Sequence, residues 1–154
     1  MVTLVLYKPQ IPPNTGNIMR LCSNTGFELH LIKPLGFTLD DKSLKRAKLD
    51  YFSDTIPMIF ENLDEYCEKL NINRLIIITK FGKKKYTEAK FKANSIIIFG
   101  SETNGLPKEF IKKNENKSFR IPMLPNSRSL NLSNAVSIIA YEAWKSLNFS
   151  GEGL

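Results

Sequence analysis

Three short segments of this chain concentrate the residue types that bind polar ligands or take part in reactions. They are residues 14–20 (NTGNIMR), 99–105 (FGSETNG) and 126–134 (NSRSLNLSN). The hydroxyl, amide, carboxylate and guanidinium groups in these segments suit a polar ligand or a substrate hydroxyl. None of them contains GxGxxG or GxxxxGKS/T, which argues against a Rossmann dinucleotide site and against a P-loop.

Arg20 lies on a polar stripe of the helix predicted for the first segment. Asn17, Arg20 and Asn24 are spaced as one helical face, and Ile18 and Leu21 mark another. A polar stripe of this kind is often simply solvated. The alternative is that Arg20 projects into a site and holds a phosphate or a reacting oxygen through its rigid fork of donors. The residues alone leave both interpretations open.

The second and third segments also allow a structural and a functional interpretation. Gly100 permits close approach of the backbone to a flat ligand and Gly105 permits a left-handed turn, but an ordinary strand-to-helix turn uses glycine in the same way. Glu102 by itself could serve as a carboxylate at a helix N-terminus. In residues 126–134, serine and asparagine outnumber the one or two that a helix cap requires, which favours ligand binding slightly over capping.

Strands and helices alternate along the chain, and this order predicts an α/β fold with a mostly parallel sheet flanked by helices. Predicted strands cover residues 3–7, 28–33, 75–79, 95–99 and 119–123; a predicted helix capped by Asn14 or Thr15 ends at Gly26, and others cover 40–48, 61–70, 108–112 and 132–147. Apolar runs without alternation, as in 75–79 and 95–99, are typical of strands covered on both faces. Ligands bind such sheets at the carboxyl ends of the strands, where the polar segments are expected to lie.

Length and composition indicate one globular domain, residues 1–154. No apolar run approaches the roughly 18 residues of a membrane span, and the N-terminal residues lack a basic leader. Cys22 and Cys67 have no CxxC spacing and His30 is the only histidine, so the sequence predicts no metal site. Free cysteines fit a reducing compartment, and we therefore expect a soluble cytoplasmic protein without a membrane partner.

A net charge of +7 indicates a polyanionic partner, with nucleic acid as the first expectation. Basic residues gather in two clusters that are candidate contacts to an RNA backbone: Lys42, Lys45, Arg46, Lys83, Lys84 and Lys85. Charge clusters are also common on solvated faces, so the residues leave both roles open. His30 and Trp144 are expected to be structural, the first within a strand and the second on the apolar stripe of the last helix.

Taken in order, the three segments resemble the signature motifs of the SPOUT superfamily of S-adenosylmethionine-dependent RNA methyltransferases. The resemblance runs from VLYKPQIPPNTGNIMRLCSNTG through FGSETNGLP to RIPMLPNSRSLNLSNAVSIIAYEAW, nearly the whole chain. The compact single domain and the stretch LIKPLGFTLDDKSLKRAKLDY are similar to the TrmL (YibK-like) branch. Members of that branch are tRNA 2′-O-methyltransferases of the anticodon wobble nucleotide.

This resemblance implies a topology, a cofactor and partners that the residue patterns did not show. The family fold contains a C-terminal deep trefoil knot, one of the rare exceptions to unknotted topology. S-adenosyl-L-methionine would be the methyl donor and S-adenosyl-L-homocysteine the product, and no metal would be needed. The expected partners are a tRNA anticodon stem-loop, methylated on the ribose 2′-hydroxyl of a wobble cytidine or uridine, and a second copy in a homodimer whose active site lies at the subunit interface.

The resemblance also assigns roles to residues at matching motif positions. Positions lining the cofactor are Ile78, Thr79, Gly100, Ile121, Ser129 and Leu130, and catalytic positions are Asn14, Arg20, Glu102, Ser129 and Asn131. The family arginine is proposed to act as a base, but a guanidinium with a pKa above about 12 is a poor one. We expect Arg20 instead to orient the adjoining phosphate and to stabilise the developing alkoxide.

Other functions compete with this expectation. A ribosomal RNA 2′-O-methyltransferase of the same fold is the nearest alternative, although such relatives usually carry an additional RNA-binding domain. A non-catalytic RNA-binding module would use the same basic surface, but the intact motif residues argue against it. A nucleotide-binding α/β protein unrelated to RNA is disfavoured by the positive charge and by the missing phosphate-binding motifs.

Overall fold

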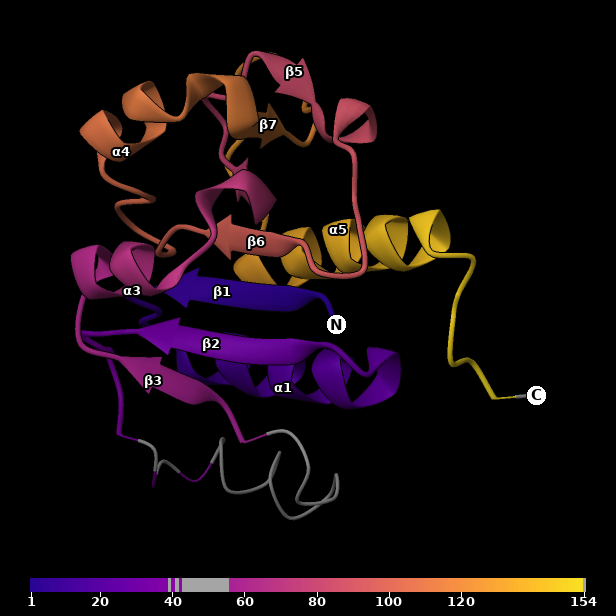
Figure 1. Ribbon diagram of the computed structural model, residues 1–154. Coiled ribbons are helices and arrows are strands. Elements are labelled where there is room, and N and C mark those ends of the chain that lie inside the picture. Colours follow the sequence, from indigo (N-terminus) through magenta and orange to yellow (C-terminus); the bar gives the residue numbers. More distant parts are fainter. Residues whose placement is uncertain (39, 41, 43–55, 154) are drawn as a thin grey trace.

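A parallel sheet forms the centre of the protein (Figure 1). The computed structural model describes residues 1–38, 40, 42 and 56–153, and within them the sheet has seven strands in the order β3-β2-β1-β6-β4-β7-β5. The strands are β1 (Thr3–Tyr7), β2 (Glu28–Ile32), β3 (Met58–Phe60), β4 (Leu75–Ile78), β5 (Lys84–Lys85), β6 (Ile96–Phe99) and β7 (Ser118–Arg120). Every neighbouring pair is parallel, as the sequence predicted for most of the sheet.

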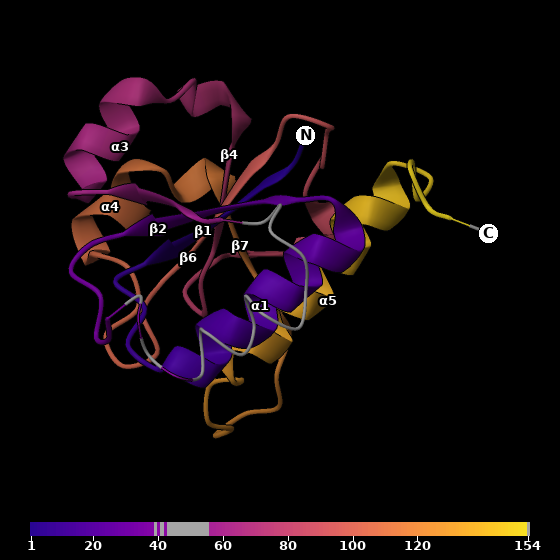
Figure 2. The same cartoon turned by 90° about the horizontal axis from the view of Figure 1, so that it is seen from below.

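Helices cover both faces of this sheet. On one face α1 (Pro12–Thr25) packs beside α5 (Leu132–Ser146), and on the other lie α3 (Leu63–Lys69) and α4 (Lys108–Lys113) (Figure 2). Short 3₁₀ turns occupy Ile72–Arg74, Tyr86–Glu88 and Glu115–Lys117. The result is a three-layer α/β/α arrangement, which explains why the central strands are apolar on both sides.

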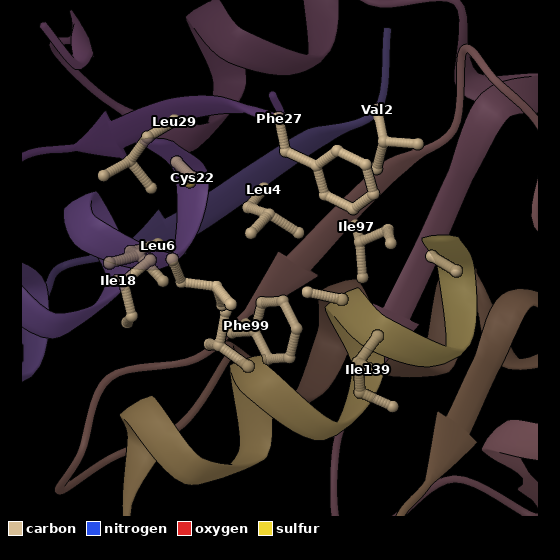
Figure 3. Packing of buried hydrophobic residues seen from close by; sticks show 14 of the residues in the cluster. Val2, Leu4, Leu6, Ile18, Cys22, Phe27, Leu29, Ile97, Phe99 and Ile139 are labelled. Carbon is tan, nitrogen blue, oxygen red and sulfur yellow. The ribbon is translucent and has the colours of Figure 1, made fainter. Parts of the chain in front are cut away.

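Side chains of the central strands alternate between two hydrophobic clusters, because successive residues of a strand point to opposite faces. The larger cluster lies between the sheet and the α1–α5 pair and includes Leu4, Leu6, Ile18, Phe99 and Ile139 (Figure 3). Val5, which separates two of these residues on β1, belongs instead to the cluster with Tyr66 of α3 and Ile111 of α4. Trp144 packs against the larger cluster, as predicted for a structural residue.

Most predicted elements are confirmed. Strands predicted at 3–7, 28–33, 75–79 and 95–99 match β1, β2, β4 and β6 to within one residue at each end, and α3, α4 and α5 fall within two residues of the predicted helices. β7 is shorter than the strand predicted at 119–123. The helix predicted at 40–48 lies outside the described residues apart from Asp40 and Lys42.

Two edge strands were not predicted, because they are too short to show a periodic pattern. β3 has three residues and pairs with β2 at the edge of the sheet. β5 consists of two lysines that pair with β7 at the opposite edge. They are strands because each pairs with a neighbouring strand, and no pattern of residues marks them in the sequence.

The predicted start of the first helix is wrong. α1 begins at Pro12 with Ile11 as its N-cap residue, three residues before the predicted cap Asn14 and four before the alternative Thr15. Proline is well suited to the first helical positions, because its fixed φ fits the helix and its missing N–H would have no partner there. The helix ends as predicted at Gly26, whose φ of 69° is left-handed.

Candidate active site

A cleft of about 460 Å³ is lined by residues that follow the carboxyl ends of β1, β4, β6 and β7. Ligands bind at this edge of open parallel sheets. Of the residues to which the resemblance assigned catalysis or cofactor binding, all except Arg20 line the cleft: Asn14, Ile78, Thr79, Gly100, Glu102, Ile121, Ser129, Leu130 and Asn131. The three polar segments of the sequence therefore converge on one cavity.

Glu102 connects the loop after β6 to the start of α1. Its Oε2 accepts a hydrogen bond from the backbone N–H of Gln10 at 2.9 Å, and its Oε1 accepts from the backbone N–H of Ile11 at 3.1 Å. The amide Nδ2 of Asn14 donates to the same Oε1 at 3.2 Å. The helix dipole favours a carboxylate at this end of α1. Both carboxylate oxygens are engaged within the protein, which favours a positioning role for Glu102 over that of a free base.

Asn14 and Asn131 extend this connection to α5. Asn131 donates from Nδ2 to Oδ1 of Asn14 at 3.0 Å, and its own Oδ1 accepts from the backbone N–H groups of Ser133 and Asn134 at 2.9 and 3.3 Å. Asn131 thus caps α5 while it lines the cleft. The capping and functional interpretations of the third segment are therefore compatible. We call the connected side chains of Glu102, Asn14 and Asn131 the cleft network.

Gly100 allows the two ends of the loop after β6 to touch. A Cβ atom on Gly100 would lie 2.4 Å from the carbonyl carbon of Gly105, far inside van der Waals contact. Ser101 and Gly105 exchange backbone hydrogen bonds of 3.3 and 3.1 Å. Gly105 has a φ of 65°, which confirms the predicted left-handed turn. The sequence predicted that a flat ligand would approach the Gly100 backbone closely. In the structure the atoms that approach it closely belong to the backbone of Gly105 and Leu106.

The wall of the cleft combines aliphatic groups with hydroxyl groups. Ile78 is buried, Ile121 is half-buried and Leu130 is exposed at the mouth. Thr79 and Ser129 add hydroxyl groups at the same cavity. Apolar walls with a few fixed polar groups are typical of sites for small organic molecules.

Arg20 lies outside this cleft, although it is on the same helix as Asn14. Its side chain is exposed, whereas Asn14 is buried. The two residues are separated by about 1.7 turns of α-helix, so their side chains leave α1 in different directions. Within one chain the sequence-predicted arginine is not brought together with the cleft network.

The predicted RNA-binding lysines are exposed where the structure describes them. Lys84 and Lys85 form β5, and Lys83 before them makes an ion pair with Glu115 at 2.6 Å. Lys42 is also exposed. The remaining two predicted contacts, Lys45 and Arg46, lie outside the described residues.

Sequence reasoning missed Gln10, which bonds to the loop after β6, and Phe81, which lines the cleft. Gln10 accepts a hydrogen bond at its Oε1 from the Thr103 hydroxyl at 2.9 Å, which adds a second link between the loop after β6 and the start of α1. Lys80 and Phe81 line the cleft directly after the predicted Thr79. Nothing in the type or spacing of Gln10 marks it, but an aromatic and a basic residue at the end of a buried strand are a usable signal.

His30 and the two cysteines are not at this site. His30 makes a 2.9 Å hydrogen bond from its ring to the Tyr66 hydroxyl, away from the cleft. Burial raises the pKa of the Cys22 thiol to about 12, so the thiol stays protonated. Among residues 1–38, 40, 42 and 56–153, no group of histidine, cysteine or acidic side chains is placed to hold a metal ion. The helices of that same part include none that is both long and apolar enough to cross a bilayer.

Comparison with known proteins shows the family of the chain. Residues 1–141 match the SpoU rRNA Methylase family. The chain is 47% identical over 152 residues, 98% of its length and 99% of the relative's, to a tRNA (cytidine(34)-2′-O)-methyltransferase of Methylovorus glucosotrophus (strain SIP3-4).

Two solved structures share the fold. One, concerned with the 2-OH methylation of C/U34 on tRNA, superposes with a TM-score of 0.87 at 38% identity and covers 96% of this chain and 97% of that one. The other is the SpoU methyltransferase AviRb from Streptomyces viridochromogenes in complex with AdoMet. It superposes with a TM-score of 0.80 at 22% identity, covering 97% of this chain and 58% of that one.

Proposed function

Because the chain belongs to the SpoU rRNA Methylase family, we propose that it is an S-adenosylmethionine-dependent tRNA 2′-O-methyltransferase acting on cytidine or uridine at position 34. The observation that carries the proposal is the 47% identity, along almost the full length of both chains, to an enzyme named for that reaction. We assign the cofactor and RNA sites to one domain, and we place the protein in the cytoplasm with its tRNA substrate.

The cleft residues fit the proposed cofactor. A cavity of about 460 Å³ lies within the range of typical small-molecule sites. Ile78, Ile121 and Leu130 offer apolar contact to a flat base, and the hydroxyls of Thr79 and Ser129 can bond a ribose. When bound, S-adenosylmethionine supplies a sulfonium methyl group, which the ribose 2′-oxygen takes as the carbon–sulfur bond breaks and the hydroxyl proton leaves to solvent.

The chain's own residues would act mainly by positioning. The cleft network fixes the start of α1 and the start of α5 relative to the loop after β6. A transfer of this kind depends on alignment of the reacting atoms within a few tenths of an ångström. Ser129 is exposed at the cleft. We propose that its hydroxyl donates a hydrogen bond to the substrate ribose when it does not bond the cofactor.

We further propose that the active site is completed by a second copy of the chain in a homodimer. Arg20 does not line the cleft of its own chain, and α5 exposes the apolar side chains of Ile138 and Tyr141. A second copy packed on this helical face would bury the apolar groups and could bring its Arg20 to the first copy's cleft. There the guanidinium would hold a substrate phosphate and stabilise the developing alkoxide.

Mixed dimers test this arrangement. Arg20→Ala and Ser129→Ala are each expected to lose most activity as pure proteins. If each site combines Arg20 of one copy with Ser129 of the other, a dimer that pairs the two variants contains one intact site and regains up to half of the wild-type activity. Mixed dimers as inactive as the pure variants would show that both residues act within one chain.

The proposed fold also includes the C-terminal trefoil knot of the family. One close backbone approach between distant segments supports it. A Cβ atom added at Gly82 would lie 2.4 Å from the backbone of Phe119. Such an approach is expected where one segment passes tightly beside another. A crystal structure of the dimer would test the path of the chain at this point.

A methyl-transfer assay tests the proposed function. Radiolabelled S-adenosylmethionine is supplied with bulk tRNA that lacks wobble 2′-O-methylation, and the labelled nucleotide is mapped by nuclease digestion. We expect label on the ribose at position 34. No label with cofactor binding intact would point to ribosomal RNA as the alternative substrate, and absence of both label and cofactor binding would leave a non-catalytic RNA-binding module.

A further inference from the structure

An exposed aromatic ring lies at the mouth of the cleft. Phe81 follows β4 and lines the cleft, yet 61% of the residue is exposed. No other phenylalanine is so exposed in the part of the chain that the structure describes. Exposure of a large apolar ring beside a binding site is unfavourable in water, and it suggests that a ligand covers the ring.

The turn that carries Phe81 is held in place from both sides. The N–H of Gly82 donates to the Thr79 carbonyl at 3.1 Å, and the Arg120 guanidinium donates to the Gly82 carbonyl at 3.0 Å. A Cβ atom on Gly82 would lie 2.4 Å from the backbone of Phe119, so the turn is pressed against β7. The backbone that carries the exposed ring is thus anchored beside the cleft.

Positive charge surrounds this ring. The Lys80 ammonium lies 5.2 Å from the Phe81 ring centroid. Lys108 lines the same cleft, and Lys84 and Lys85 follow on the exposed β5. An aromatic face among lysines matches the way proteins bind unpaired nucleotides, with bases stacked on rings and phosphates held by cations. An apolar peptide or a lipid chain would gain nothing from these charges.

We propose that Phe81 stacks on an unpaired nucleobase of the RNA substrate, at or next to the nucleotide that is methylated, while Lys80 and the β5 lysines hold the neighbouring phosphates. This inference rests on the proposed function and names a recognition residue for it. Bases of a single-stranded loop can be splayed out to stack in this way. The cofactor's adenine is a second planar group, but the exposure of Phe81 and its lysine neighbours favour RNA.

Substitution of Phe81 separates RNA binding from cofactor binding. Phe81→Ala is expected to raise the KM for tRNA about tenfold, within the range measured for loss of one base–aromatic stack. The Kd for S-adenosylmethionine should stay within about twofold, because the proposal assigns the ring to the RNA and not to the cofactor. Phe81→Tyr keeps the planar face and should behave as wild type, whereas Phe81→Leu should resemble the alanine variant. Met58→Ala is the matched control, since Met58 is 57% exposed on the distant edge strand β3.

A double-mutant cycle identifies the base. Anticodon stem-loops are made with an abasic ribose at the wobble nucleotide or at either neighbour. If Phe81 stacks on one of these bases, removal of that base weakens binding to the wild type but not further to Phe81→Ala. The coupling should appear at one position of the three.

The outcomes are distinct. Loss of cofactor affinity in Phe81→Ala, with the KM for tRNA unchanged, would assign the ring to the adenine and overturn the inference. Equal kinetics of wild type and Phe81→Ala, with wild-type methylation of tRNA intact, would overturn the inference alone. A wild type that binds the cofactor but methylates no tRNA would overturn the proposed function and this inference with it.

Discussion

Two networks of polar side chains in this protein lie in different surroundings. The cleft network joins Glu102, Asn14 and Asn131, which come from three distant segments and line an open cavity. The second network, which we call the β2–α3 cluster, joins His30 of β2 to Tyr66 of α3 and is closed by aromatic rings. The residue types most often associated with catalysis, a histidine and a tyrosine, are in the closed network. Access to a cavity therefore marks the candidate site, and the presence of a histidine or a tyrosine does not.

The β2–α3 cluster has the properties of a structural contact. The rings of Phe60 and Tyr66 meet edge to face at 4.6 Å, and the His30 ring lies 5.2 Å from Phe60. Burial raises the pKa of the Tyr66 hydroxyl well above its usual value. Burial also lowers the pKa of His30, an effect that the nearby Glu28 carboxylate opposes. Both groups are therefore held neutral near pH 7, as expected for residues that pack rather than react.

The largest effect is expected from a break in the cleft network. Glu102→Ala leaves the backbone N–H groups of Gln10 and Ile11 without their acceptor, so the start of α1 shifts relative to the cleft. We expect single-turnover methylation to slow by about a hundredfold, as for a misplacement of about 1 Å. Glu109→Ala, at an exposed position on α4, is the control. Turnover unchanged in Glu102→Ala would show that the network does not position the site.

Gly100→Ala tests whether the cleft depends on the close contact between the two ends of the loop after β6. The added methyl would lie 2.4 Å from the Gly105 backbone, and relief of that overlap must move the loop after β6. We expect a loss of about 1–3 kcal/mol in the free energy of unfolding, together with weaker S-adenosylmethionine binding by calorimetry. Gly153→Ala meets no atom within 4 Å and should change neither quantity. Unchanged cofactor binding in Gly100→Ala would contradict the role given to this loop.

A smaller and purely structural effect is expected in the β2–α3 cluster. Tyr66→Phe removes the hydroxyl that bonds to His30 and leaves the ring packing intact. We expect a loss of about 1 kcal/mol in the free energy of unfolding, measured by urea titration, and kcat within about twofold of the wild type. A large fall in kcat would give the β2–α3 cluster a functional role and remove the contrast between the two networks.

The smallest effect concerns pH. Because the pKa of His30 is lower in the folded protein, the unfolded chain takes up the proton first as the pH falls. Stability from this residue is complete above the unfolded-chain pKa of about 6.5 and declines as the pH falls toward the lower folded-state pKa. Thermal melts from pH 7.5 to pH 5 should therefore show a shallower decline in His30→Gln than in the wild type. If the melting temperatures of His30→Gln and the wild type fall equally as the pH is lowered, groups other than His30 cause the loss of stability.

Local residue patterns were sufficient for the long elements. The apolar stripe of α5 is buried along most of its length, and the unbroken isoleucine-rich runs of β4 and β6 are buried completely. Such patterns work because a long amphipathic or fully apolar segment has few ways to bury its side chains. The two-residue strand β5 has no such pattern and depends on its pairing with β7.

The start of α1 shows where local reasoning failed. Asn14 was predicted to cap the helix with its own side chain, as asparagine commonly does. The helix instead begins at Pro12, and the Glu102 carboxylate accepts the free N–H groups before it. The Asn14 side chain is thereby left to bond Glu102 and Asn131. A sequence window around residue 14 contains no information about a carboxylate 88 positions away.

The sequence by itself determined the α/β class, the parallel sheet and, through the order of its three polar segments, the family to which the chain belongs. Only the tertiary structure decided that Asn14 bonds to both Glu102 and Asn131, that Arg20 lies outside the cleft of its own chain, and that Phe81 remains exposed at the cleft. The physical reason is the separation along the chain over which each kind of interaction acts. Periodicity and turn propensity act between near neighbours, whereas hydrogen bonds and burial depend on which distant strands the sheet places side by side.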